Sequence, residues 1–310
     1  MPHDLVHGIL KNNHGSISKA ITLIENSQSP PEPFFSDIHK NAFNSVRIGI
    51  TGPPGAGKST LTNSLIEFCL ADGKEVGVIA VDPTSPFTGG ALLGDRVRMN
   101  KYAGDNRVFL RSMGSHCDLG GLSSKVQEVG DVLAASGKDY IFFETVGVGQ
   151  GEHDIINVAD VSIVVLVPES GDEIQLMKAG LIEIADIFVI NKSDREGSNR
   201  IASTLKNILH IFKKQDRREP SVFNTIANKQ EGVLELFNGI ELYLRMIDKE
   251  GLLESRKLER YRKRVFNIIQ NSLETSFWSS GKQKQLIDLT KNIDGTSIDP
   301  HTVAKQLLQG

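Results

Sequence analysis

The feature that most constrains the fold is a phosphate-binding loop between a short apolar run and a helical pattern. Residues 52–59 read Gly-Pro-Pro-Gly-Ala-Gly-Lys-Ser, which matches G-x-x-x-x-G-K-[ST]. The run Val46–Ile50 precedes the loop, and Leu61, Leu65 and Phe68 follow it at helical spacing. Because this motif binds phosphate between a strand and a helix N-terminus, the flanks predict an α/β domain that binds a nucleotide.

Short β-branched runs alternate with longer helical patterns along the middle of the chain. The runs are Val46–Ile50, Val76–Val81, Val108–Leu110, Tyr140–Phe143, Ser162–Val167 and Ile187–Ile190. They are nearly continuous in apolar residues, so each strand is buried on both faces and helices must cover both sides of the sheet. The sequence therefore predicts a doubly wound, mostly parallel α/β sheet of the P-loop NTPase type.

Helical patterns lie on both sides of these runs. The first has apolar residues at helical spacing from Ile17 to Ile24, and a proline-rich stretch at residues 29–33 ends it. After about residue 230 only helical patterns remain. The parts that we expect are an N-terminal helical extension at residues 1–40, a nucleotide-binding domain at 41–248 and a C-terminal helical extension at 249–310.

Composition narrows the class of protein. The 310 residues include 35 Lys and Arg against 38 Asp and Glu, a net charge of −3, which gives no field favouring nucleic acid or anionic lipid as a partner. The basic run 256–264 is better explained as a solvated helix that packs on a domain or a second chain than as a nucleic-acid contact. Two cysteines, Cys69 and Cys117, cannot form a disulfide framework, and the longest apolar run, Val161–Val167, is too short to span a bilayer. We expect a cytoplasmic protein.

The residues of the phosphate loop predict how it binds a nucleotide. Its glycines let successive N–H groups and the helix N-terminus face the phosphates. Lys58 places a positive charge at the β- and γ-phosphates, and the Ser59 hydroxyl can ligate Mg²⁺. The residues expected to contact the nucleotide are Gly52, Pro53, Pro54, Gly55, Ala56, Gly57, Lys58, Ser59 and Thr60.

A second motif predicts which base is bound. Asn191, Lys192, Ser193 and Asp194 read N-K-x-D at the end of an expected strand. The Asp194 carboxylate can accept two hydrogen bonds from the N1–H and amino groups of guanine, which adenine does not offer. If that carboxylate is buried, ATP would leave it unpaired. The alternative is a polar turn at a strand end.

An acidic residue follows the run Tyr140–Phe143. Glu144 stands three residues before Gly147, at the Walker B position, where a carboxylate holds Mg²⁺ directly or through water. The Gly147 N–H would then meet the γ-phosphate. Most regulatory GTPases carry Asp at this position, so Glu144 marks a different branch. A strand-end carboxylate bonded to helix termini is the alternative.

Two polar segments are expected beside the phosphates. Asp82 ends the second strand and Asp95 follows in a glycine-rich loop, so both could position Mg²⁺ or water when GTP is bound, as in switch segments, or could be solvated acids. Residues 169–178 open a helix near the same edge. They could contact a partner or the γ-phosphate, or form an ordinary acidic helix N-terminus.

Together these motifs resemble the methylmalonyl-CoA mutase-associated GTPases of the MeaB/ArgK type, within the SIMIBI class of P-loop GTPases. The stretches that carry the resemblance are residues 52–60, 81–85, 89–99, 119–122, 144–150, 171–173 and 191–194. The run from Glu144 to Gln150, followed by Asp154-Ile155, is the most specific. The resemblance implies a homodimeric, Mg-dependent GTPase that docks on a coenzyme B12-dependent acyl-CoA mutase, gates adenosylcobalamin loading and protects the mutase.

The resemblance also implies roles for single residues. Catalysis would involve Lys58, Asp82 and Asp95, with Gln175 and Lys178 in a third switch that responds to the partner, and Mg²⁺ would be surrounded by Ser59, Asp82, Asp95 and Glu144. A cation at Lys178 would stabilise γ-phosphate charge as an arginine finger does. Where the family usually has Ser-Ala after the last strand to contact the guanine carbonyl, this chain has Ile226-Ala227-Asn228. Only the Ala227 backbone N–H carries over for that contact, and Ala227 and Asn228 are both expected beside the nucleotide.

Two other functions stay open from the sequence. His116 and Cys117 are adjacent soft ligands that could bind Zn²⁺ or Ni²⁺ if a dimer supplied two more, which suits a GTP-dependent metal-insertion factor. Such a pair is more often an ordinary loop. A kinase has less support, because residues 191–194 select guanine and no residue stands out as a base for an acceptor hydroxyl.

Overall fold

The computed structural model describes residues 2–26, 32–83, 100–102, 104–115, 124–145, 155–170, 181–211, 219–291 and 299–309. The chain divides into two compact units, Met1–Lys257 and Leu258–Gly310. The first unit contains a parallel sheet with the helices that cover it, and the second contains the C-terminal helices.

Seven strands among the described residues form one sheet in the first unit, in the order β3-β2-β4-β1-β5-β6-β7. They are β1 (Val46–Thr51), β2 (Val76–Pro83), β3 (Val108–Ser115), β4 (Tyr140–Thr145), β5 (Val161–Leu166), β6 (Ile187–Asn191) and β7 (Ser221–Thr225). Every neighbouring pair is parallel. The strand order reverses at β1, which is the point where open α/β sheets bind ligands. The predicted doubly wound α/β fold is confirmed.

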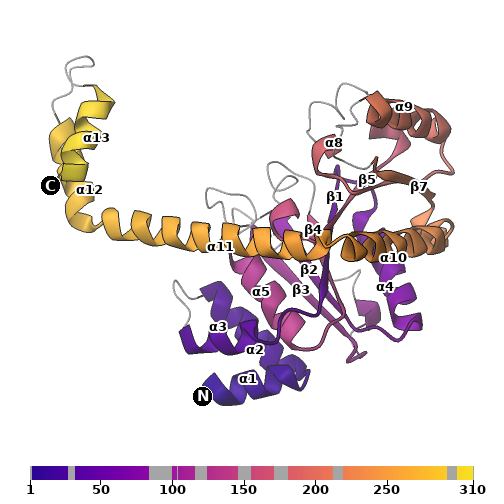
Figure 1. Ribbon diagram of the computed structural model, residues 1–310, viewed down its shortest axis with the longest axis horizontal. Helices are drawn as coiled ribbons and strands as arrows, with labels where there is room; N and C mark the ends of the chain where they lie inside the picture. Colours follow the sequence, from indigo (N-terminus) through magenta and orange to yellow (C-terminus); the bar gives the residue numbers. More distant parts are fainter. Residues whose placement is uncertain are drawn as a thin grey trace. The chain divides into compact units, whose positions relative to one another are not determined.

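Helices cover both faces of this sheet (Figure 1). One face packs against α1 (Pro2–Leu10), α2 (His14–Asn26), α3 (Glu32–His39), α5 (Ser124–Ala135), α8 (Leu181–Ile184) and α9 (Ser198–Ile211). The other packs against α4 (Lys58–Ala71) and α10 (Val233–Lys249). The short 3₁₀ turns in the described ranges are η1 (Asn100–Tyr102), η2 (Ile155–Asn157), η3 (Pro168–Ser170) and η4 (Ala227–Lys229).

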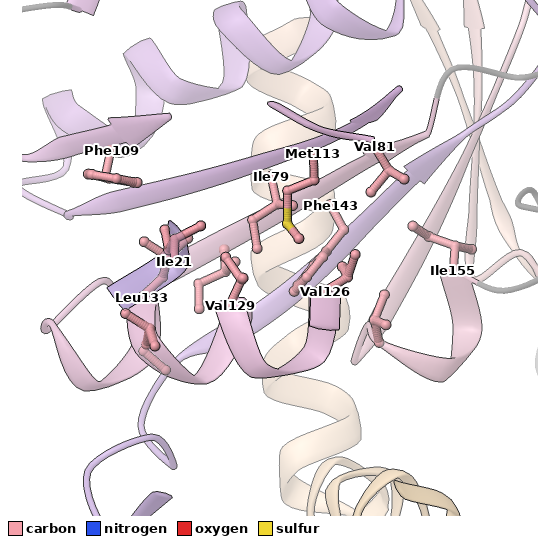
Figure 2. Packing of buried hydrophobic residues seen from close by; sticks show 14 of the residues in the cluster. Ile21, Ile79, Val81, Phe109, Met113, Val126, Val129, Leu133, Phe143 and Ile155 are labelled. Carbon is pink, nitrogen blue, oxygen red and sulfur yellow. The ribbon is translucent and has the colours of Figure 1, made fainter. Parts of the chain in front are cut away.

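Strand β4 shows why its apolar run has no polar alternation. Ile141 and Phe143 point into the cluster under α5, whereas Tyr140 and Phe142 point into the cluster under α4. Figure 2 shows Phe143 packed against Val126 of α5 in the first of these clusters. Side chains of this size each contribute roughly 1.5–3 kcal/mol when fully buried, so both helical layers are needed to stabilise the sheet.

The apolar runs predicted six strands and did not reveal the seventh, β7. Ser221 and Asn224 are exposed and only Thr225 is buried, so this edge strand lacks the apolar run of the inner strands. Strand β3 is also longer than the predicted Val108–Leu110. Its continuation is held by pairing with β2 and has one apolar residue, the buried Met113, which is too little for a local strand pattern.

The N-terminal helices share the core of the sheet. The predicted apolar residues of α2 are fully buried in the cluster that also contains α5; they are Ile17, Ala20, Ile21 and Ile24. Between α1 and α2, Asn12 adopts a left-handed conformation (φ 54°). Its Nδ2 donates to Glu75 Oε2 at 2.9 Å and to the Asn106 carbonyl at 3.0 Å, which ties this turn to the amino end of the sheet.

The last part of the chain is helical, as its sequence pattern predicted. It contains α11 (Leu252–Phe277), α12 (Ser280–Thr290) and α13 (Pro300–Gln309). Within the second unit the buried side chains of α13 are Val303 and Leu307, and Lys282 of α12 donates to the Leu307 carbonyl. Of the helices that the structure describes, none has the length and apolar character needed to cross a membrane.

Candidate functional site

The phosphate-binding loop joins β1 to α4, and two of its positions require glycine for steric reasons. At Gly52 (φ 138°) a Cβ would lie 2.1 Å from the Val165 carbonyl oxygen of β5. At Gly57 (φ 85°), which caps α4, a Cβ would lie 2.4 Å from Asn191 Nδ2. A side chain at either position would push the loop away from the neighbouring strands, so glycine is needed for this close approach.

Lys58 is the first residue of α4 and folds back over the loop. Its Nζ donates to the Gly52 carbonyl at 2.7 Å and to the Pro53 carbonyl at 3.0 Å, and the residue is only 6% exposed. The ammonium group therefore lies inside the turn of the loop, beside the N-terminus of α4. Both features favour an anion at this point.

Glu144 ends β4 next to the start of α4. Ser59 Oγ donates to one carboxylate oxygen, and Thr62 Oγ1 lies 3.4 Å from the other. Glu144 is 5% exposed, so its charge is held near the loop rather than in solvent. Carboxylate and hydroxyl oxygens are the donors that Mg²⁺ prefers, so Ser59 and Glu144 fit such an ion.

Asn191 joins three segments at the end of β6. Its Nδ2 donates to the Ala56 carbonyl at 2.8 Å, and its Oδ1 accepts from Thr225 Oγ1 and from the Ala227 N–H, each at 3.1 Å. Next to it, Lys192 Nζ donates to the Gly55 carbonyl at 2.8 Å. The N-K-x-D segment thus binds the phosphate loop directly, and Asn191, 2% exposed, is part of the core.

Asp194 differs from the expected buried carboxylate. Its side chain is 42% exposed and lies 3.4 Å from Lys229 Nζ. The Ala227 N–H, predicted to meet the guanine carbonyl, donates to Asn191 in this structure, and Asn228 is exposed. A guanine base bound here would have to displace Lys229 from Asp194 and share the Ala227 N–H with Asn191.

Several predicted residues lie outside the described residues: Asp95, Gly147, Gln175, Lys178, His116 and Cys117. Asp82 belongs to β2, paired with Gly114 of β3, but its side chain is not among those described. Within the described ranges, no group of three His, Cys, Asp or Glu side chains is placed to hold a metal ion.

The sequence motifs did not identify two polar residues of the site. Thr62 faces Glu144 because it stands four residues after Lys58, one turn along the same face of α4, and this spacing could have revealed it. Thr225, which donates to Asn191, lies in the unpredicted strand β7, so the sequence offered no signal for it.

The chain is similar to known proteins along most of its length. The model of the family described as Methylmalonyl Co-A mutase-associated GTPase MeaB matches residues 17–282. A Pyrococcus abyssi protein is 39% identical over 312 residues, covering 100% of this chain and 96% of that protein. GTPase ArgK of Escherichia coli is 32% identical over 315 residues, covering 97% and 94%. A solved structure described as LAO/AO transport system kinase has a TM-score of 0.74 at 24% identity, covers 99% of this chain and 96% of that one, and supports the fold.

Proposed function

The chain belongs to the family of methylmalonyl Co-A mutase-associated GTPases of the MeaB type, and from this premise we propose that it is a chaperone of a coenzyme B12-dependent acyl-CoA mutase. As a member of this family it is a P-loop GTPase that hydrolyses GTP to GDP and phosphate. The observation that carries the proposal is the family match over residues 17–282. The mutase of methylmalonyl-CoA type is the proposed client, whose adenosylcobalamin loading it would gate and whose activity it would protect.

We assign GTP binding to the residues that converge at the carboxyl ends of β1, β4 and β6. The loop 52–60 and the N-terminus of α4 would bind the phosphates, and Asn191, Lys192 and Asp194 would bind guanine together with the Ala227 N–H. Lys58 would exchange its two carbonyl contacts for phosphate oxygens, which are charged and therefore stronger acceptors.

Mg²⁺ is part of this proposal. Ser59 and Glu144 would hold it, with Asp82 and Asp95 as further candidates. When bound, the ion neutralises charge that develops on the phosphates. The residues of the chain orient the substrate: Lys58 acts on the β- and γ-phosphates, while Gln175 and Lys178 are proposed to complete the site when a partner is bound.

A homodimer is also proposed. The part of α11 that lies in the second unit exposes large apolar side chains at helical spacing; they are Leu258, Tyr261, Val265, Phe266, Ile269 and Leu273, with exposed fractions from 39% to 66%. Such a stripe on a charged helix is typical of a surface that packs against another chain.

The proposal is tested by steady-state GTP hydrolysis, alone and with the B12-dependent mutase from the same organism, at fixed Mg²⁺ and salt. We expect severalfold stimulation by the mutase and its loss in Lys178→Ala, because that cation would reach the γ-phosphate only when the partner is bound. No stimulation together with no co-elution would refute the mutase as client, while hydrolysis by the protein alone would remain.

A further inference from the structure

The loop that follows β7 is closed by its own backbone. The Ile226 N–H donates to the Glu231 carbonyl at 2.9 Å, and the 3₁₀ turn η4 lies between them. Gln230 adopts a left-handed conformation (φ 61°), and at Gly232 a Cβ would lie 2.1 Å from the Asn224 carbonyl oxygen. The backbone of the loop is therefore held together by its own contacts, and contacts at its ends determine where the Ala227 N–H lies.

Two side chains of α4 hold this loop. Ser64 Oγ donates to the Ala227 carbonyl at 2.9 Å, and Ser64 and Ala227 are 6% and 3% exposed. Three residues further along the helix, Glu67 accepts a hydrogen bond from Gln230 Nε2. Residues three apart lie on one helix face, so Ser64 and Glu67 contact opposite ends of the same short turn.

Glu67 also contacts a third segment. Its other carboxylate oxygen forms an ion pair with Lys101 of η1. The neighbouring Tyr102 is 7% exposed and donates to the Asn63 carbonyl at 3.0 Å, and burial, with the charge of Glu67, raises the pKa of Tyr102 to about 12. Glu67 thus accepts from donors on two segments that are far apart in the sequence. Hydrogen bonds to a charged acceptor are stronger than neutral ones.

We propose that Glu67, with Ser64, is a positioning residue for guanine: it holds the turn 227–230 on the helix that carries the phosphate loop, so that the Ala227 N–H is fixed relative to the phosphates. This inference rests on the proposed function, in which residues 191–194 and Ala227 bind guanine. A backbone N–H held in place before the base arrives loses less conformational freedom on binding. Glu67 touches neither base nor phosphate in this role.

The role makes a chemical prediction that simple stabilisation of the fold does not make. The Ala227 N–H can act only on a base with an oxygen at position 6. Loss of Glu67 should therefore weaken the binding of guanine nucleotides. The binding of 2-aminopurine nucleotides, which lack that oxygen, should stay nearly unchanged. A general loosening of the site would weaken both nucleotides equally.

The experiment compares Glu67→Ala with Asp72→Asn. The control also removes one negative charge, from an exposed acid directly after α4. For the full chain, the dissociation constants of GDP and of fluorescent 2-aminopurine riboside diphosphate are measured, together with KM and kcat for GTP. In Glu67→Ala we expect GDP to bind about fivefold more weakly, KM to rise by a similar factor and kcat to stay within about twofold, since two partly exposed hydrogen bonds are lost. Asp72→Asn should match the unchanged protein.

Two further variants separate the possible failures. Glu67→Gln keeps an acceptor for Gln230 and should recover most of the GDP affinity. Asp194→Asn tests the guanine site itself, because an amide can donate to the 2-oxo group of xanthine and should shift preference toward xanthine nucleotides. Equal weakening of GDP and the 2-aminopurine nucleotide in Glu67→Ala, or no weakening, would overturn the positioning role. An unchanged base preference in Asp194→Asn would instead overturn the assignment of the guanine site.

Discussion

Two glycines of the phosphate loop provide a matched pair of substitutions. Gly55 (φ 74°) and Gly57 (φ 85°) both have left-handed backbones, so alanine at either position costs about 1 kcal/mol in backbone strain. Their surroundings differ. A Cβ on Gly55 meets nothing within 4 Å, whereas a Cβ on Gly57 lies 2.4 Å from Asn191 Nδ2.

The magnitude of the difference follows from the Asn191 contacts. To make room for the new methyl group, Asn191 must give up its bond to the Ala56 carbonyl (2.8 Å) and shift the two bonds, each 3.1 Å, that its Oδ1 accepts. Because Asn191 is 2% exposed, water does not replace these partners. An unsatisfied buried polar group costs about 1–3 kcal/mol. We therefore expect Gly57→Ala to be about 2 kcal/mol less stable than Gly55→Ala, or about thirtyfold in the unfolding equilibrium.

The assay is urea unfolding of both variants without nucleotide, followed by circular dichroism, with GDP affinity measured in parallel. The absence of nucleotide matters because a methyl group at residue 55 is exposed and could touch a bound phosphate. Equal unfolding free energies for the two variants would refute the argument that residue 57 lies against Asn191. A larger loss in Gly55→Ala would refute it as well.

Two other predictions concern the first unit. Arg256 donates to Asp186 at 2.9 and 3.1 Å and to the Asp160 carbonyl at 2.7 Å. Arg256→Met should therefore lower the unfolding free energy by about 2 kcal/mol in the same denaturation assay. The side chain of Arg245 is 77% exposed, so the control Arg245→Met should change it by less than about 0.5 kcal/mol. Burial raises the pKa of Tyr102 and of Tyr243 from 10.0 to about 12, so their neutral forms stabilise the fold fully below pH 10 and this contribution is lost as pH rises through 12. The part of the phenolate absorbance that Tyr102→Phe and Tyr243→Phe remove should appear near pH 12, and its appearance near pH 10 in folded protein would contradict this.

The sequence predicted the sheet well because burial on both faces leaves a local signal. In β4 every residue is buried and the apolar run was found directly. In β7 only Thr225 is buried, so the strand had no such signal, although it completes the sheet and places Thr225 beside Asn191. Strand β7 is defined by its pairing with β6, and no short stretch of the sequence contains both strands.

In the candidate site, too, the residues that were predicted have a local signal in the sequence. Lys58, Glu144 and Asn191 were found because each stands at the end of an apolar strand or in a motif with fixed spacing. The exposed state of Asp194 was not predicted, since it depends on Lys229, whose position is set by the turn after β7. Local spacing thus identifies the residues that can act on a ligand more readily than the partners that hold them.

This difference explains why α4 matters beyond its first turn. Its N-terminus is fixed by Gly57 against Asn191, and its next two turns hold the loop after β7 through Ser64 and Glu67. Asn191, which lies against Gly57, also accepts from the Ala227 N–H and so contacts both α4 and this loop. Ser64, Ala227 and Asn191 are buried, so displacing any of these three must move a buried neighbour, and core packing resists such shifts. Substitutions on α4 far from the phosphates, such as Glu67→Ala, are therefore expected to alter the affinity for guanine through the loop after β7, while the phosphate loop keeps its own contacts.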